Sequence, residues 1–199
     1  MSYIHQENIK TSKIDLDDFQ LAENHIQKVM NGKKVKRILF VNPPDVDEKI
    51  FDYNVARRGR GNNYPSYGVG ILAAQLRNIS YEVDIINLNH EVLKEVYYHD
   101  ENKEFNYTNV WQTKIINKIK KFKPDLIGVS CLFSVTHNSF KNVCSLIKKE
   151  FKNIPLLVGG VHVSHDIEGV IKDLNDNIDF VCLFEADLAL PNLLKIING

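Results

Sequence analysis

The chain has 199 residues, of which 25 are Lys or Arg and 25 are Asp or Glu, so its formal charge at neutral pH is zero. This length suits one well-buried domain with a modest extension, and the charge balance disfavours binding to nucleic acid or to an anionic membrane. No stretch has the apolar length of a membrane span or the pattern of a signal peptide, which predicts a cytoplasmic protein.

The first part of the chain predicts a helix followed by a strand. Apolar residues at helical spacing indicate a helix over residues 14–30, within an N-terminal helical extension over residues 1–34. The sequence RILFVN (residues 37–42) then predicts a strand, which ends at Pro43-Pro44 because neither proline can donate a hydrogen bond to a strand ladder.

A long connection, residues 45–67, follows the first strand and is expected to be a mobile loop over the strand ends. It contains Arg57, Arg58 and Arg60. These arginines are suited to gripping a phosphate or carboxylate, but a solvated basic loop is the simpler interpretation, and the sequence does not decide between them.

The sequence YGVGILAAQLRN (residues 67–78) predicts a helix with Ser66 at its N-cap. Gly68, Gly70 and Ala73 match the dinucleotide-binding pattern G-x-G-x-x-A. That pattern requires its glycines in the turn directly after a strand, and no strand precedes them closely, so we expect the glycines to serve close packing of the helix on the sheet.

Beyond this helix, strands and helices alternate to the end of the chain. The alternation predicts a doubly wound α/β fold with a five-stranded parallel sheet in the flavodoxin-like order 2-1-3-4-5, over residues 35–199. The further strands are expected at residues 82–87, 125–132, 155–158 and 178–183, and the further helices at 90–98, 110–122, 139–151, 167–174 and 188–197.

The strand at residues 125–132 is almost continuously apolar, which is typical of the centre of a parallel sheet. Open α/β sheets bind ligands beyond the carboxyl ends of such strands, at the topological switch point. Paired glycines there would let a bulky ligand approach the main chain. The candidate site residues follow the third, fourth and fifth strands: Ser130, Cys131, Leu132, Gly159, Gly160, Val161, His162 and Glu185.

Each candidate also has a structural explanation. Ser130 and Glu185 can cap the following helices, and Gly159-Gly160 can form an ordinary tight turn. The three cysteines, Cys131, Cys144 and Cys182, are too widely spaced to suggest a disulfide framework or a zinc site.

Four segments, YPSYGVGILAAQLR, KPDLIGVSCL, LLVGGVHVS and IDFVCLFEAD, together resemble the cobalamin-binding domain at the N-terminus of cobalamin-dependent radical S-adenosylmethionine enzymes. The resemblance implies that the sheet accepts the dimethylbenzimidazole tail of cobalamin and that the corrin ring lies over the strand ends. It implies that Ser130 and Leu132 occupy the family's S-x-L positions and that Gly159 and Gly160 line the tail. His137 and His162 are candidate contacts to corrin amides or to cobalt.

The chain departs from the family in three places. The segment NPPDVDEKIF lacks the D-x-H-x-x-G motif, so cobalamin would bind without that motif's histidine ligand. The last loop reads FEAD instead of G-E-G-E. No C-x-x-x-C-x-x-C motif occurs, so an iron–sulfur cluster and S-adenosylmethionine would require a missing domain or a partner, and the resemblance assigns no catalytic residue or metal ligand to this chain.

Three alternatives to cobalamin binding arise. A phosphoacceptor receiver domain needs an aspartate at the end of the third strand, where this chain has Ser130. A flavin or nucleotide carrier needs a phosphate-cradling loop, and Asp45-Val46-Asp47 after the first strand forms none. A degenerate domain that only contacts other proteins is the third possibility.

Overall fold

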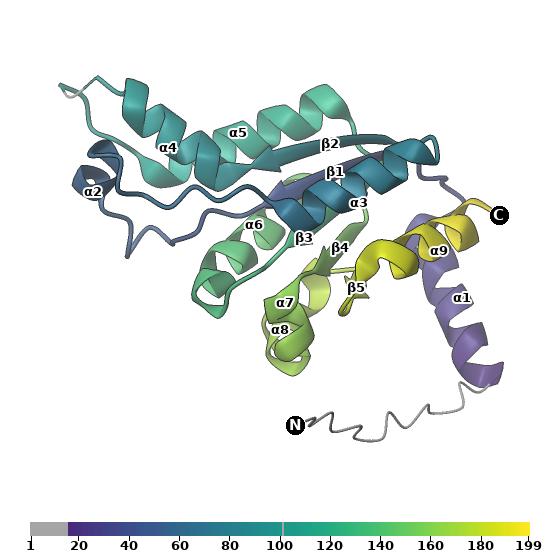
Figure 1. Cartoon of the computed structure of the whole chain (residues 1–199). Coiled ribbons are helices and arrows are strands. Elements are labelled where there is room, and N and C mark those ends of the chain that lie inside the picture. The colour runs from purple at the N-terminus through teal and green to yellow at the C-terminus, as the bar shows by residue number, and fades with distance from the viewer. Residues whose placement is uncertain (1–15, 101) are drawn as a thin grey trace, which may run out of the picture. The chain divides into compact units, whose positions relative to one another are not determined.

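The computed structural model describes residues 16–100 and 102–199 (Figure 1). The chain divides into two compact units, residues 1–33 and 34–199. The described part of the first unit, residues 16–33, contains helix α1 (Leu16–Met30). The first turn of this helix carries Asp17 and Asp18, whose negative charges are favourable at the positive end of the helix dipole. The start of this helix predicted at residue 14 lies outside the described residues.

The second unit is built on a five-stranded sheet in the order β2-β1-β3-β4-β5. All neighbouring strands are parallel, which confirms the predicted flavodoxin-like topology. The strands are β1 (Arg37–Asn42), β2 (Glu82–Asn87), β3 (Leu126–Ser130), β4 (Leu156–Gly159) and β5 (Phe180–Cys182).

Most helices lie where the sequence predicts them, but two short ones were missed. Helix α2 lies inside the connection expected to be a loop, and α7 follows directly after β4. The helices of this unit are α2 (Tyr53–Arg57), α3 (Tyr67–Asn78), α4 (Leu88–Tyr98), α5 (Tyr107–Phe122), α6 (His137–Glu150), α7 (Val161–His165), α8 (Ile167–Leu174) and α9 (Ala186–Asn198), with 3-10 turns η1 (Ser134–Thr136) and η2 (Asn175–Asn177).

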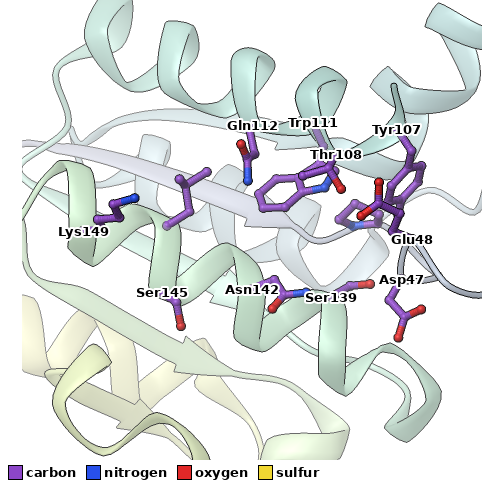
Figure 2. Close-up of a pocket in the computed structure, with 12 residues that line it drawn as sticks. Asp47, Glu48, Tyr107, Thr108, Trp111, Gln112, Ser139, Asn142, Ser145 and Lys149 are labelled. Atoms are coloured by element: carbon purple, nitrogen blue, oxygen red, sulfur yellow. The ribbon is translucent and has the colours of Figure 1, made fainter. Parts of the chain in front are cut away.

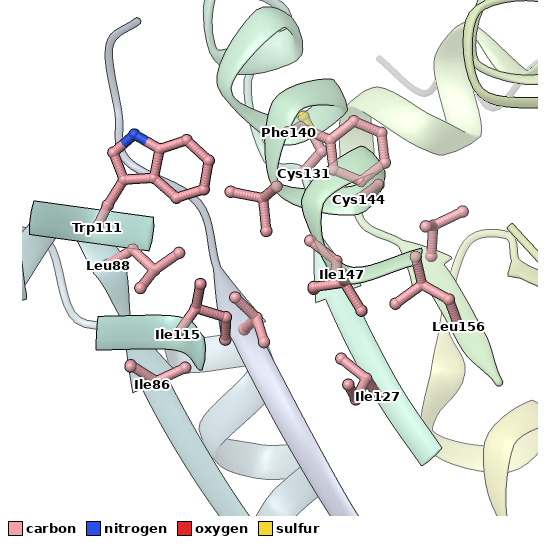
Figure 3. Packing of buried hydrophobic residues seen from close by; sticks show 14 of the residues in the cluster. Ile86, Leu88, Trp111, Ile115, Ile127, Cys131, Phe140, Cys144, Ile147 and Leu156 are labelled. Atoms are coloured by element: carbon pink, nitrogen blue, oxygen red, sulfur yellow. The ribbon is translucent and has the colours of Figure 1, made fainter. Parts of the chain in front are cut away.

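The main hydrophobic core fills one face of the sheet, beneath α4, α5, α6 and α8 (Figure 3). Leu39 and Val41 of β1 and Ile127 and Val129 of β3 belong to it, and each is at most 1% exposed. Because side chains alternate along a strand, the intervening residues face the other side of the sheet. That side packs against α3 and α9, which contact β2, β5 and each other.

Hydrogen bonds anchor the connection between β1 and α3, which the sequence predicted to be mobile. The buried Asn89 side chain donates to Asp45 Oδ2 at 2.9 Å and to the Asn62 carbonyl at 2.7 Å, and it accepts from the Asp45 backbone N–H at 3.2 Å. Burial raises the pKa of the Asp45 carboxyl. The start of α4 therefore holds both ends of the connection.

Two of the three arginines of this connection donate hydrogen bonds to helix carbonyls, whereas the sequence left an anion-binding role open for all three. Arg57 donates to the carbonyls of Val96 and Tyr97, at the C-terminal end of α4, where helix carbonyls lack partners within the helix. Arg58 donates to the Asn54 carbonyl within its own turn at 2.9 Å. Arg60 is exposed.

The expectation that Gly68 and Gly70 allow close packing of α3 is wrong. A Cβ atom built on either residue meets nothing within 4 Å. Contact with the rest of the domain is made by Val69, Ala73 and Leu76, the buried residues of this helix.

Within residues 16–100 and 102–199, no helix combines the length and the apolar character needed to cross a bilayer.

Candidate functional site

Small and polar residues form a row across the carboxyl end of the sheet, on the side covered by α3 and α9. Val41 pairs with Val129, so the next residues, Asn42 and Ser130, are neighbours across the strands. Ser130 pairs with Gly159, and Gly159 pairs with Cys182. This row (Asn42, Ser130, Gly159 and Cys182) leaves little side-chain volume above the strand ends, at the predicted switch point.

Two buried acceptors on the α3 and α9 side of the sheet lack a hydrogen-bond partner in the described part of the chain. They are Asn42 Oδ1 at the end of β1 and Gln75 Oε1 on α3. The amide nitrogen of Gln75 donates to the Asp187 carbonyl at 2.7 Å and so joins α3 to α9. An unsatisfied buried acceptor costs free energy, so each is a position where a ligand N–H would be stabilising.

Apolar side chains form an exposed rim around the ends of β3, β4 and β5. Phe184 is 78% exposed, which is unusual for so large an apolar side chain outside a binding surface. The apolar rim consists of Leu132, Phe133, Val135, Val161, Leu183 and Phe184.

The neighbouring backbone alone accounts for the paired glycines, while the approach of a ligand to the main chain that the sequence suggested stays a prediction. A Cβ on Gly160 would lie 2.4 Å from the Cys131 carbonyl oxygen, and the φ of Gly160 is +109°. A Cβ on Gly159 would lie 3.0 Å from the Cys182 carbonyl oxygen. Both glycines therefore position the strand ends, whether or not a ligand is bound.

Only the backbone of Cys131 takes part in the site. Its side chain is 1% exposed and belongs to the core on the other face of the sheet (Figure 3). Burial raises the pKa of the thiol to about 11. The Cys131 backbone accepts from the His162 N–H at 3.2 Å and donates to the Gly159 carbonyl at 2.9 Å.

His162, a candidate contact to the corrin ring or cobalt, is buried. Only 6% of it is exposed. Its Nδ1 lies 3.1 Å from Ser134 Oγ, and its Nε2 lies 2.8 Å from His137 Nδ1. The other ring nitrogen of His137 lies 3.1 Å from Asp173 Oδ2. All four ring nitrogens are engaged within the protein, which argues against either histidine as a cobalt ligand in this conformation.

The electrostatics of this cluster favour a neutral His162. Burial, followed by the proximity of His137, lowers the pKa of His162. Hydrogen bonds from His137 and then Lys141 lower the pKa of Asp173. Sequence reasoning missed Ser134 and Asp173. The local signal for Ser134 was its position three residues before the candidate His137, and no local signal marked Asp173.

The loop after β5 joins the site through Ser164. Ser164 Oγ accepts from the Phe184 N–H at 2.7 Å and donates to the Gly160 carbonyl at 3.2 Å. Glu185 occupies the N-cap position of α9, but its side chain makes no capping hydrogen bond. Its carboxylate is exposed beside the apolar rim.

A cavity of about 330 Å³ lies elsewhere, on the α5 and α6 side of the sheet (Figure 2). Burial raises the pKa of Tyr107 in its wall, and the carboxylates of Asp47, Asp45 and Glu48 add to this effect. None of the site residues predicted from the sequence lines it. Its walls are Pro44, Asp47, Glu48, Tyr107, Thr108, Trp111, Gln112, Ser139, Asn142, Ser145, Leu146 and Lys149.

The family model of the B12 binding domain matches residues 53–194. The chain belongs to this family. It is 28% identical over 174 residues to cytidylyl-2-hydroxyethylphosphonate methyltransferase of Streptomyces wedmorensis, covering 84% of this chain and 29% of that protein. It is 25% identical over 165 residues to an uncharacterized methyltransferase of Pyrococcus horikoshii, covering 83% of this chain and 30% of that protein.

This B12-binding domain therefore spans 29% and 30% of the lengths of these two relatives. Among solved structures, a cobalamin-binding protein from Desulfitobacterium hafniense shares the fold, with a TM-score of 0.50 and 14% sequence identity over 92% of this chain and 71% of that one.

The residues at the carboxyl end of the sheet fit cobalamin, the ligand of this family. The small side chains of the row would let the nucleotide tail lie close to the sheet. Asn42 Oδ1 and Gln75 Oε1 can accept from amide N–H groups of the ligand, because each is buried without a partner in the described residues. The apolar rim suits the large flat ring.

We expect Gly160→Ala to destabilise the apo B12-binding domain by about 3 kcal/mol, because the new Cβ meets the Cys131 backbone at a positive φ. Gly70→Ala is the matched control. It adds a methyl group in open space within a helix and should stabilise the domain by up to about 1 kcal/mol. Urea unfolding measures both, and equal stability of Gly160→Ala and the wild type would contradict this account.

We expect the apo domain to lose stability as the pH falls below the ordinary histidine pKa of about 6.5. The pKa of His162 is lower in the folded state than in the unfolded chain. As the pH falls, the unfolded chain therefore binds a proton at this residue before the folded state does, and the free energy of unfolding decreases. The contribution of His162 is complete above that pH and is lost below it. Thermal midpoints at pH 7.5 and 5.5 should differ less in His162→Gln than in the wild type, while His165→Gln, at an exposed position of the same helix, should retain the wild-type difference.

Proposed function

We propose that this chain is the cobalamin-binding module of a cobalamin-dependent radical S-adenosylmethionine methyltransferase. One observation carries the proposal: the row of small residues and unpartnered acceptors lies under an exposed apolar rim, at the switch point of a B12-binding domain. Both relatives named above are methyltransferases and are much longer than this chain. When bound, cobalamin supplies methyl-relay chemistry.

The residues of the chain would hold the cofactor in a defined way. Ser130 and Gly159 would lie along the nucleotide tail, and Asn42 would accept from an amide of the ligand. Leu132, Val161 and the other rim residues would contact the corrin ring, with Glu185 at its edge. The match to the B12 binding domain family favours cobalamin over a flavin or nucleotide as the ligand.

The proposed module binds cobalamin without a histidine from the segment after β1. Residues 43–66 contain no histidine. Asp45, which would begin the D-x-H-x-x-G motif, is instead bound to Asn89. The iron–sulfur cluster and S-adenosylmethionine belong to a radical domain in cis or in a partner protein.

We expect the purified chain to bind hydroxocobalamin tightly enough to retain it through gel filtration. The absorbance spectrum of the protein peak measures the bound corrinoid. A colourless protein peak would rule out the proposal, and retention of flavin mononucleotide instead would support the flavin alternative.

Asn42→Leu provides a paired test within the same site. Removing a buried acceptor that has no partner should leave apo stability unchanged or raise it, while cobalamin affinity should fall about tenfold through loss of one hydrogen bond. A variant that lost stability and kept its affinity would show that the acceptor serves the fold and not the ligand.

We also expect this chain alone to assemble no iron–sulfur cluster. Its three cysteines are buried, and their sequence positions do not provide the required spacing. Anaerobic reconstitution with iron and sulfide, followed by iron analysis, tests this expectation. Stoichiometric iron bound to folded protein would contradict it.

A further inference from the structure

Four side chains from four elements form one continuous hydrogen-bonded chain at the carboxyl end of the sheet. Ser134 of η1 contacts His162 of α7, which contacts His137 of α6, which contacts Asp173 of α8. The three contacts measure 3.1, 2.8 and 3.1 Å. Ser134 is exposed beside the apolar rim, and at the other end Lys141 Nζ lies 3.3 Å from Asp173 Oδ2. We call this chain the relay.

The positions of the protons in the relay follow from the carboxylate at its end. An ionised Asp173 only accepts hydrogen bonds, so His137 Nε2 must carry a proton. In a neutral His137, Nδ1 is then an acceptor and receives the Nε2 proton of His162. His162 Nδ1 is in turn an acceptor, and the Ser134 hydroxyl donates to it. Every proton in the neutral relay therefore has a defined position, and the Ser134 oxygen presents only lone pairs to its surroundings.

One added proton reverses the end of the relay at Ser134. If the proton resides on His162, both ring nitrogens of His162 carry hydrogen. If it resides on His137, that ring donates from both nitrogens, and His162 must adopt the tautomer with hydrogen on Nδ1. In either case His162 Nδ1 donates to Ser134, whose O–H is then free to donate outward. The protonation state of the histidine pair thus sets the polarity of an exposed hydroxyl.

The surroundings favour the neutral form near neutral pH. His162 is 6% exposed. The charged and titratable groups that act on it are His137 of α6 and Asp166 at the N-cap of α8. Burial and His137 lower the pKa of His162, against the opposing effect of Asp166. Asp173 and Lys141 face His137 from the solvent side.

We propose that Ser134 is a ligand-binding residue that accepts a hydrogen bond from a corrin amide, and that the relay makes this contact dependent on pH. The inference rests on the proposed function, because it places the corrin ring at the apolar rim beside Ser134. Proton uptake by the histidine pair leaves Ser134 with one free lone pair and an outward O–H in place of two lone pairs, and it adds a positive charge beside the amide N–H, so it weakens this contact. Cobalamin binding and protonation of the relay therefore oppose each other by linkage.

The relay is tested first on the apo protein. Long-range ¹H–¹⁵N spectra of the chain labelled with ¹⁵N-histidine report the tautomer of each ring, with His137→Gln and His162→Gln used for assignment. At pH 8 we expect hydrogen on Nε2 of both histidines. As the pH falls, one proton should be taken up jointly, and hydrogen should appear on His162 Nδ1. Hydrogen on His162 Nδ1 already at pH 8 would overturn the relay.

The ligand contact is tested with methylcobalamin in the dark, whose axial methyl group does not titrate. Affinity of the wild-type chain should be about three- to tenfold weaker at pH 5.5 than at pH 7.5, the effect of one neutral hydrogen bond. Ser134→Ala should bind at pH 7.5 at least as weakly as the wild type does at pH 5.5. Its affinity should change less than about twofold over this range, because it lacks the hydroxyl whose hydrogen bond depends on pH. His165→Gln should keep the wild-type pH dependence.

The outcomes separate the two hypotheses. A wild-type affinity that does not change with pH, or a pH dependence that persists in Ser134→Ala, overturns the contact at Ser134 while the proposed function stands. Failure to bind methylcobalamin at any pH overturns the proposed function and the contact together. The tautomers seen in the apo spectra then still decide whether the relay exists.

Discussion

The site depends on one close backbone approach, between Cys131 at the end of β3 and Gly160 at the end of β4. The two segments exchange hydrogen bonds, from the Cys131 N–H to the Gly159 carbonyl and from the His162 N–H to the Cys131 carbonyl. No side chain at residue 160 fits between them, because its Cβ would lie 2.4 Å from the Cys131 carbonyl oxygen. This junction lies beside the contact between His162 and Ser134.

The two faces of the sheet have different roles. Beneath α4, α5, α6 and α8 the packing is apolar and closed, and most of the buried side chains lie there. On the α3 and α9 side, the ends of the strands carry small residues and buried acceptors without partners in the described residues. Such acceptors lower stability unless something donates to them. The closed face can hold the strands in register while the other face remains available for a ligand.

Much of the fold could be predicted from the sequence, because each strand is an apolar run bounded by proline, glycine or polar residues. The strand order followed from the alternation of strands and helices and from the choice of residues 125–132 as the centre. The short helix α7 was missed, since VHVSH has neither the length nor the apolar spacing of a helix.

The site was predicted less completely. The sequence located Gly159 and Gly160 correctly at a strand end, but their neighbours proved to be backbone carbonyls, which no local pattern reveals. The contact between Ser134 and His162 joins residues 28 positions apart and depends on side-chain rotamers. At Gly68 and Gly70 the error was the opposite one, because tight packing was predicted where there is none. A glycine in a helix does not by itself indicate tight packing.

The anchored segment after β1 limits how this domain could acquire a histidine ligand. Asp47 stands two residues after Asp45, where the D-x-H-x-x-G motif has its histidine, so one substitution would restore that part of the motif. The side chain at this position, however, lines the cavity on the α5 and α6 side and contacts Asn138 of α6 (Figure 2). A histidine there would face away from the row. Cobalt ligation from this segment would require a new backbone path from β1 to α3, and point mutation alone would not convert one kind of B12 domain into the other.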